Sequence, residues 1–582
     1  MFSQLLNYRG HYKTSDSVWT KRAVVFLVLL TASWGFAQSS HSRLSGELQG
    51  RRGGNHVDVI IQYTVSPEQK HFDKVMGKGG AVKADLRGAI NGAAFRVPES
   101  ALEELAADPD VLYISSDRPI QSFTYSNNPD FYEQAVFAQS AWNQYSGSGI
   151  GIALVDSGIT NNGEFGNRIV YSQSFVGTQT TTYGHGTHVA GILAGGGSNS
   201  NGANFKKTFV GVANGANLIN LRVLDQNGAS SDSVVISAIQ KAISLKSTYN
   251  IRVINLSMGR PVYESYVLDP LCQAVEQAWK AGIVVVVAAG NDGRDNSQNT
   301  NGYGTIAAPG NDPYVITVGA MKPMGTPDRS DDLIASYSSK GPTLLDHVVK
   351  PDLVAPGNLI ISTLASTSAS LYTPSTMVPT NYYNNLGNSS ASTAYFKLSG
   401  TSMAAPVVSG AAALMIQKTP SLTPDHVKAR LMKTAYKNFP QYSTATEPTT
   451  GQTYTSQYDI FTVGAGYLDI QNAMQNTDLA SSTVGSANSP TVTRDANGNI
   501  VLVKATSVIW GGSVVWGTSV VWGSSVIWGT NVTGQSVLWG SSVVWGTSSM
   551  QGYSVVWGTS VVWGTSSNDA SEATAIETGG EN

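Results

Sequence analysis

The chain has 582 residues, too many for one hydrophobic core, so two or three folded units with tails are expected. Its 36 basic and 39 acidic residues give a net charge of -3, and this balance argues against a nucleic-acid partner. A single cysteine, Cys272, excludes an intramolecular disulfide, so packing or bound ions must secure the fold.

The first 37 residues have the features of a secretory signal peptide. Lys21 and Arg22 precede the apolar run 23–30, and Gly35 and Ala37 frame a small-residue cleavage pattern. The apolar run is much shorter than the roughly 20 residues that a membrane-spanning helix needs. We therefore predict that residues 1–37 are removed on export and that the remaining chain has no membrane segment.

Residues 38–125 predict a small α+β unit. Strand patterns are expected over 56–63, 92–97 and 111–114, with helices starting near Ser66 and covering 98–107. Taken alone, this order of elements fits any small binding domain.

From Gly149 onward, strands and helices alternate, which predicts a doubly wound parallel sheet and an α/β fold. Asp156 follows the first of these strands and Asn291 follows a later one. In such sheets ligands bind at the carboxyl ends of strands, so both side chains are candidates for chemistry. Both also stand near a glycine, where Asp and Asn commonly serve as turn residues. The expected strands are 150–155, 218–224, 253–257 and 283–289, and the expected helices are 232–245 and 271–281.

Two histidines, His185 and His188, lie three residues apart at the start of an apolar helical segment. This spacing would allow a metal pair on one helix face. No third ligand follows at short range, however, and the HExxH pattern is absent. An imidazole at a helix N-terminus suits a general base better, because its pKa lies near neutrality. His185 is therefore the candidate base.

The segment Gly400–Pro406 introduces a small, apolar run that suits a buried helix. Ser402 then lies at the helix N-terminus, where backbone N–H groups and the helix dipole stabilise developing negative charge. A serine here is also a common helix cap. The presence of an acid, a base and a carboxamide elsewhere in the chain favours a nucleophile.

Together these motifs resemble the subtilisin-like serine peptidases, in which the acid, the base and the nucleophile follow in this chain order. The resemblance runs from about Trp142 to Ile470. It rests on the segments 155–158, 185–191, 288–291 and 400–406.

The resemblance implies a secreted serine endopeptidase that hydrolyses polypeptides through an acyl-enzyme. It assigns Asp156 to orient His185, His185 to take the proton of Ser402, and Asn291 to bind the oxyanion. His188 is expected to be structural. The chemistry requires no cofactor.

The resemblance also implies how peptides bind. Ser257, Met258 and Gly259 resemble the family's substrate-lining strand, on which an extended peptide pairs as an added strand, and residues 224–228 resemble the facing loop. Residues 38–125 become an inhibitory pro-domain, an intramolecular partner that is cut off autocatalytically between Arg118 and Asn128. The peptidase domain is assigned to residues 126–475.

Family members often bind structural calcium, and residues 199–204 occupy a loop where one family site usually lies. This loop lacks carboxylates and is followed by Lys206 and Lys207, so structural calcium is kept as an open possibility without any assigned ligand, and the metal-site prediction is none. The Ser/Thr-rich segment 363–392 is expected to be a flexible surface insertion.

Residues 476–582 form a low-complexity tail in which a Ser-Val-Val-Trp-Gly-Thr unit recurs from Ser507 onward. The even period places each Trp on one face of an extended chain. A stacked β-solenoid and a self-associating tail are both compatible with this repeat. The aromatic rings would also suit binding to a surface such as polysaccharide, although the Val-Val-Trp setting favours packing.

Two other functions compete with proteolysis. A secreted surface-assembly protein would have an inactive body and act through the tail, but the four intact site residues argue against it. An α/β-hydrolase esterase would need a second glycine after the serine and a base later in the chain, and Gly400–Ala404 lacks that glycine.

Overall fold

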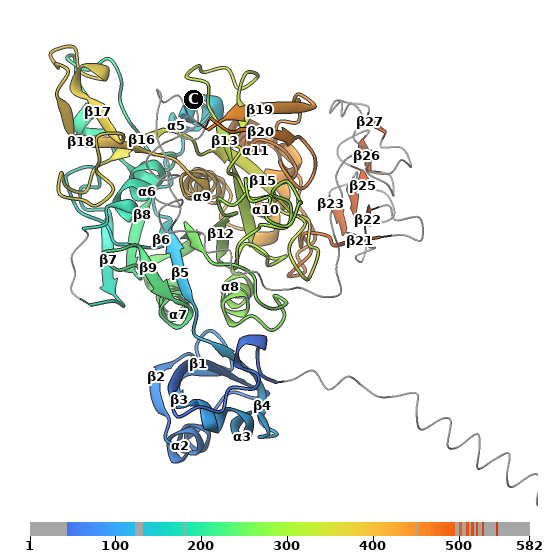
Figure 1. Ribbon diagram of the computed structural model, residues 1–582. Helices are drawn as coiled ribbons and strands as arrows, with labels where there is room; N and C mark the ends of the chain where they lie inside the picture. The colour runs from blue at the N-terminus through green and yellow to red at the C-terminus, as the bar shows by residue number, and fades with distance from the viewer. Residues whose placement is uncertain are drawn as a thin grey trace, which may run out of the picture. The chain divides into compact units, whose positions relative to one another are not determined.

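The computed structural model describes residues 43–122, 132–177, 182–447 and 451–494, and short strands between residues 500 and 544 (Figure 1). The predicted signal peptide, residues 1–37, lies outside the described residues. No helix in the described ranges is both long and apolar enough to span a membrane.

The N-terminal part contains an antiparallel sheet with the strand order β2-β3-β1-β4. Alternation along β1 divides its side chains between two cores. Val59 and Ile61 pack with Phe72 and Leu102 of the small helices, whereas Ile60 belongs to the large core of the chain. The elements are η1 (Gly46–Leu48), β1 (His56–Tyr63), α2 (Gln69–Gly77), β2 (Ala81–Asp85), β3 (Gly92–Pro98), η2 (Glu99–Ala101), α3 (Leu102–Ala106) and β4 (Val111–Ser116).

The large sheet has the strand order β14-β13-β12-β10-β6-β8-β7, with β15 also beside β13. Its pairings are parallel except that of β14 with β13, so the sheet is mixed, where the sequence predicted a parallel one. The strands are β6 (Gly151–Asp156), β7 (Ile169–Ser174), β8 (Asn217–Arg222), β10 (Ile251–Leu256), β12 (Val284–Ala288), β13 (Ile316–Lys322), β14 (Leu333–Ile334) and β15 (Leu353–Pro356).

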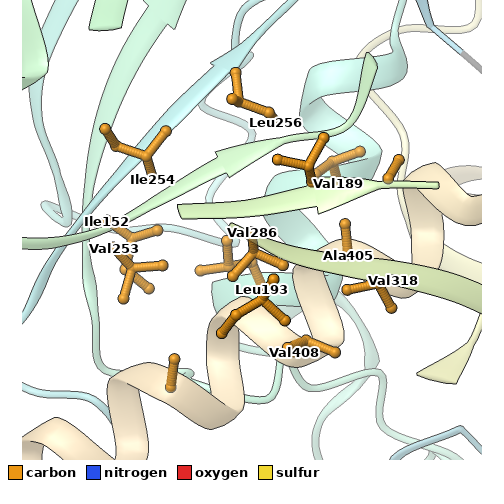
Figure 2. Packing of buried hydrophobic residues seen from close by; sticks show 14 of the residues in the cluster. Ile152, Val189, Leu193, Val253, Ile254, Leu256, Val286, Val318, Ala405 and Val408 are labelled. Atoms are coloured by element: carbon orange, nitrogen blue, oxygen red, sulfur yellow. The ribbon is translucent and has the colours of Figure 1, made fainter. Parts of the chain in front are cut away.

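Two pairs of helices cover this sheet, and each pair is in mutual contact. One pair is α6 (His185–Ala194) and α9 (Thr401–Lys418), and the other is α7 (Asp232–Tyr249) and α8 (Pro270–Lys280). Helix α9 consists mainly of small and apolar residues. It is buried from Thr401 through Ile416, which explains its lack of a polar face. Figure 2 shows Leu193 of α6 and Val408 of α9 packed beside Val286 and Val318 of the sheet.

The segment 363–392 is not the simple surface insertion that the sequence predicted. It contains β17 (Met377–Pro379) and η4 (Thr380–Tyr382), and β17 joins a sheet with β16 (Ile360–Thr363) and β18 (Ala391–Leu398). Tyr383 and Val378 are buried in a cluster with Phe209 and Tyr395. The aromatic residues that looked like solvent-facing loop residues therefore build a second small core.

The remaining elements connect these layers. They are β5 (Pro119–Ser122), α4 (Tyr132–Ala135), α5 (Gln139–Trp142), η3 (Ser198–Ser200), β9 (Ala229–Ser231), β11 (Met258–Gly259), α10 (Pro424–Thr434), β19 (Tyr442–Thr446), β20 (Thr453–Gln457), α11 (Ile470–Gln475), β21 (Val492–Arg494) and β22 (Ile500–Leu502).

In the tail, short strands occur within the six-residue repeat. Strand β23 (Val508–Trp510) pairs antiparallel with β24 (Val514–Trp516), and β25 (Val520–Val521) pairs antiparallel with β26 (Val526–Trp528). Strand β27 (Val543–Val544) runs parallel to β26. Trp539, Trp545, Trp557 and Trp563 lie outside the described residues, and the tail's architecture stays a prediction.

Candidate active site

Three of the predicted site residues lie side by side at the carboxyl ends of three neighbouring strands of the large sheet. Strand β10 lies between β6 and β12, with Leu256 opposite Val155 on one side and Val287 on the other. Asp156 ends β6 and Ser257 follows β10, while Asn291 lies just beyond β12. This is the carboxyl edge at which parallel sheets place their ligand sites.

Asp156 and His185 form a fully buried pair. The His185 Nδ1 and Asp156 Oδ1 atoms are 2.7 Å apart, and the Ser157 N–H donates to the same carboxylate oxygen at 2.6 Å. With a proton on Nδ1, the contact assigns Nε2 as the acceptor of the neutral ring. Within the described residues this Nε2 is buried without a hydrogen-bond partner. A buried acceptor without a hydrogen-bond partner destabilises the folded state by about 1–3 kcal/mol. Such an atom calls for an explanation, and a role in accepting a proton during catalysis provides one.

The turn before α6 fixes where this imidazole lies. Gly184 precedes His185 with φ +94°, a left-handed conformation that favours glycine. A Cβ atom on Gly184 would also lie 2.9 Å from the Ala369 side chain. Further along, the Gly186 N–H donates to the Ser157 hydroxyl at 2.9 Å, which ties α6 to the end of β6.

Ser402 is the second residue of α9, and its side chain is buried. Its hydroxyl donates to the Ser257 carbonyl at 2.9 Å, and the Ser257 hydroxyl donates to the Ser402 carbonyl at 2.8 Å. The structure thus joins His185 directly to Asp156, and Ser402 directly to Ser257. Because α6 and α9 pack against each other, the helices that carry the base and the hydroxyl are neighbours.

Asn291 is held by the residue that precedes Ser402. Its side-chain Oδ1 accepts hydrogen bonds from the Thr401 N–H and from the Thr401 hydroxyl, each at 3.0 Å. The amide Nδ2 is then a buried donor with no hydrogen-bond partner among the described residues. An uncharged donor beside a helix N-terminus can stabilise a developing oxyanion.

Sequence reasoning missed Thr401 and Ser157, each of which adjoins a predicted site residue. Their hydroxyls fix the carboxamide of Asn291 and the start of α6. Adjacency to Ser402 and Asp156 was the only sequence signal, and it does not specify a hydrogen-bond partner far along the chain.

His188 faces a different partner from His185. Its Nε2 lies 3.0 Å from the Ile360 carbonyl, and its ring meets the edge of Phe396 with centroids 4.9 Å apart. Burial, with a contribution from His185, lowers the pKa of His188 to about 3, so the ring is neutral at physiological pH. The described part of the chain holds no group of three or more His, Cys, Asp or Glu side chains that could bind a metal.

The loop 199–204 contains no carboxylate of its own. The neighbouring carboxylate of Glu164 accepts the N–H groups of Ser198 and Asn199 at 3.0 and 2.9 Å, and it also accepts the Tyr395 hydroxyl. Glu164 therefore ties the start of this loop to the buried Tyr395.

The predicted substrate strand is paired with a segment of the same chain. Met258 and Gly259 of β11 lie opposite Ser122 and Gln121 of β5, in antiparallel register. On its other side β5 pairs with β9, so β5 is the middle strand of three. The facing strand is residues 229–231, slightly later than the predicted loop 224–228, which forms the turn before it. An extended peptide therefore fits between β9 and β11.

A doubly wound α/β core with a buried carboxylate–imidazole pair and a serine at a helix N-terminus defines the class of serine hydrolases. The fold is shared with the crystal structure of fervidolysin from Fervidobacterium pennivorans, described as a keratinolytic enzyme related to subtilisin. That match has a TM-score of 0.55 and 21% identity, and covers 79% of this chain and 66% of fervidolysin.

A model of the subtilase family matches residues 147–466. The chain is 34% identical over 405 residues to serine protease AprX of Bacillus subtilis, covering 67% of this chain and 85% of AprX. It is 34% identical over 402 residues to subtilisin E of the same organism, covering 68% of this chain and 89% of subtilisin E. The chain belongs to the subtilase family and is a subtilisin-like serine endopeptidase.

Proposed function

We propose that this endopeptidase cleaves polypeptides through an acyl-enzyme formed on Ser402, with His185 as the base and Asp156 as its partner. The observation that carries this proposal is the buried 2.7 Å contact between His185 and Asp156, which leaves Nε2 as an acceptor at the sheet edge where Ser402 lies. The neighbouring α6 and α9 helices support the proposed approach of the two residues.

The reaction follows from these groups. The Ser402 Oγ attacks the scissile carbonyl carbon while its proton moves to the His185 Nε2, and Asp156 stabilises the imidazolium. The oxyanion accepts hydrogen bonds from the Asn291 Nδ2 and the Ser402 N–H. The carbon–nitrogen bond then breaks, and the leaving amine takes the proton from His185. Water repeats the sequence to release the acid, and no cofactor is required.

We further propose that residues 38–125 are a pro-domain that inhibits the enzyme until it cuts itself free between Arg118 and Asn128. Strand β5 supports this, because it pairs with β11 as a substrate would. The Asp117 carboxylate accepts the Ser233 N–H at 2.7 Å at the start of α7, and the Asp232 N–H donates to the Arg118 carbonyl at 2.8 Å. These contacts support a tight intramolecular complex.

Export and the role of the tail complete the proposal. The charged and apolar pattern over residues 21–37 supports secretion as a zymogen. The Trp repeat supports a tail that self-associates or binds a surface outside the cell.

Labelling with a phosphonate that reacts with activated serines tests the proposal. We expect the matured protein to take up one phosphonate on the peptide that contains Ser402, because only an activated hydroxyl attacks phosphorus at a useful rate. Intact-mass and peptide-mass measurements locate the label. Attachment to another serine, together with casein cleavage, would reject the assignment of Ser402.

Replacing Asn291 by leucine is expected to lower kcat by about 10²–10³-fold with little change in KM, the effect of losing the equivalent donor in subtilisin. Leucine matches the shape of the carboxamide but cannot donate to the oxyanion. Steady-state kinetics on a chromogenic peptide measure the change. The exposed Asn385 provides the control, because Asn385→Leu should leave kcat unchanged. An equal fall in both variants would remove Asn291 from the mechanism.

A further inference from the structure

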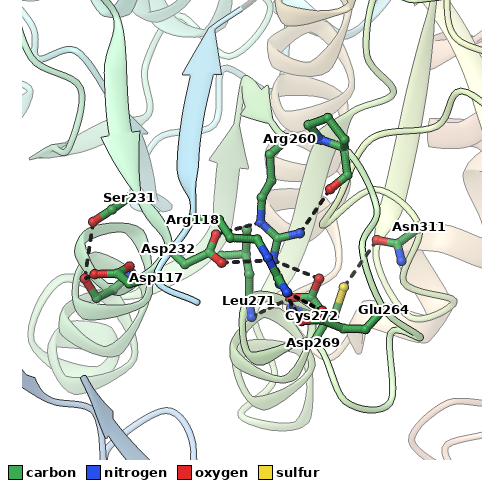
Figure 3. Close-up of polar contacts among 12 residues, drawn as sticks. Asp117, Arg118, Ser231, Asp232, Arg260, Glu264, Asp269, Leu271, Cys272 and Asn311 are labelled. Atoms are coloured by element: carbon green, nitrogen blue, oxygen red, sulfur yellow. Dashed lines mark hydrogen bonds and ion pairs between the residues drawn. The ribbon is translucent and has the colours of Figure 1, made fainter. Parts of the chain in front are cut away.

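The guanidinium of Arg118 lies in a site built for it, just before β5. Its Nη1 and Nη2 donate to the two carboxylate oxygens of Glu264 (Figure 3). The guanidinium carbon Cζ lies 4.8 Å from the centroid of the Tyr263 ring. The Arg118 side chain is only 4% exposed. A bidentate contact with a carboxylate and stacking on an aromatic ring both suit the planar guanidinium of arginine. The ammonium group of lysine can make neither contact in this way.

Tyr263 and Glu264 belong to the peptidase body, between β11 and α8. A third group, Glu47 of η1, comes from the N-terminal part and accepts from the Arg118 Nε and Nη2 at 3.0 and 2.6 Å. Arg260 pairs with the carboxylates of Asp232 and Asp269 at 2.8–2.9 Å, and the charge of Glu264 also acts on Arg260. Among these described residues three carboxylates therefore share one cation when Arg118 is absent. The peptidase body therefore has too few positive charges around Glu264, and Arg118, which precedes β5, supplies the missing one.

The register of β5 connects this site to the substrate cleft. Arg118 lies three residues before Gln121, which pairs with Gly259 of β11. A polypeptide bound in the same register would place its corresponding residue at Glu264. We propose that Tyr263 and Glu264 form an arginine-binding subsite, filled by Arg118 in the precursor and by an arginine of polypeptide substrates in the mature enzyme. This inference rests on the proposed function, in which substrates bind between β9 and β11 and are cleaved by Ser402.

Peptide kinetics test the specificity. Fluorogenic peptides with the sequence of residues 116–128 would carry either arginine or its neutral analogue citrulline at the position of Arg118. Burial raises the pKa of Glu264 to about 7, so the assay is run well above that pH, where the carboxylate is charged. We expect kcat/KM for the arginine peptide to be at least about tenfold higher, mainly through KM. Glu264→Gln should remove this preference, and the control Glu276→Gln on α8 should retain it.

Equal cleavage of the two peptides by the wild-type enzyme, or a preference that survives Glu264→Gln, would overturn the subsite. A second measurement does not depend on catalysis. In the full-length Ser402→Ala chain, Arg118→Ala opens the site, and ethylguanidinium serves as the probe. We expect a saturable rise in Tm of a few degrees, absent when Glu264→Gln is added.

No rise in Tm with ethylguanidinium, or an equal rise in the Glu264→Gln background, would also overturn the subsite. If the Arg118→Ala chain folds only with the probe present, that result supports the subsite. Failure of the proposed function would look different: no peptide would be cleaved, while the effect of ethylguanidinium on Tm would persist.

Discussion

Replacing Ser402 by alanine is expected to lower kcat for peptide hydrolysis by about 10⁶-fold, the size of the loss when subtilisin loses its nucleophile. The hydroxyl that attacks the carbonyl is then missing, although α9 and the Asn291 contact with Thr401 stay in place. The same change should leave the chain uncut at residues 118–128, because the proposed maturation uses the same serine. Casein cleavage and the intact mass of the expressed protein measure both effects.

A matched control exists on the same helix. Ser409 is a buried serine of α9 whose hydroxyl donates to the Asn255 side chain at 2.8 Å, away from the proposed chemistry. Ser409→Ala should cost about 1 kcal/mol of unfolding free energy and leave kcat and maturation intact. Activity that survives Ser402→Ala would reject the site. Normal maturation of the Ser402→Ala chain would reject autoprocessing alone.

Changing Asp156 to asparagine is expected to lower kcat by about 10⁴-fold while the structure of the site is retained. The asparagine amide can donate to the His185 Nδ1, which moves the ring proton to Nε2. The ring then cannot accept the proton of Ser402. Steady-state kinetics measure the loss, and near-UV circular dichroism reports the fold. Asp328→Asn, at an exposed aspartate, is the control and should leave kcat unchanged. A loss below about tenfold would show that the carboxylate does not act on His185.

The sequence was most informative about the large sheet and the ends of its strands. Apolar runs such as 284–288 are buried on both faces of the sheet, so the sequence predicts them as parallel strands. The polar residues that follow these runs indicate the candidate site at the carboxyl ends of the strands. The same reasoning could not predict the antiparallel β14 strand, because two residues carry no periodic signal.

Other features depend on contacts between distant residues. The Arg118 contact with Glu264 spans 146 residues of chain, and nothing near either residue indicates the other. The segment 363–392 looked like a polar insertion from its composition. Its Tyr residues pack on Phe209, and the local sequence does not indicate this partner because Phe209 lies far away in the chain. Propensity describes local structure, whereas these residues are ordered by tertiary packing.

The central claim is that Asp156, His185 and Ser402 act as one unit. Combining Asp156→Asn with Ser402→Ala and measuring kcat tests this most directly, because residues of one catalytic unit have strongly non-additive effects. We predict that the double variant is no slower than Ser402→Ala alone. A further fall of about 10⁴-fold would show that the carboxylate and the serine act independently and would contradict the account.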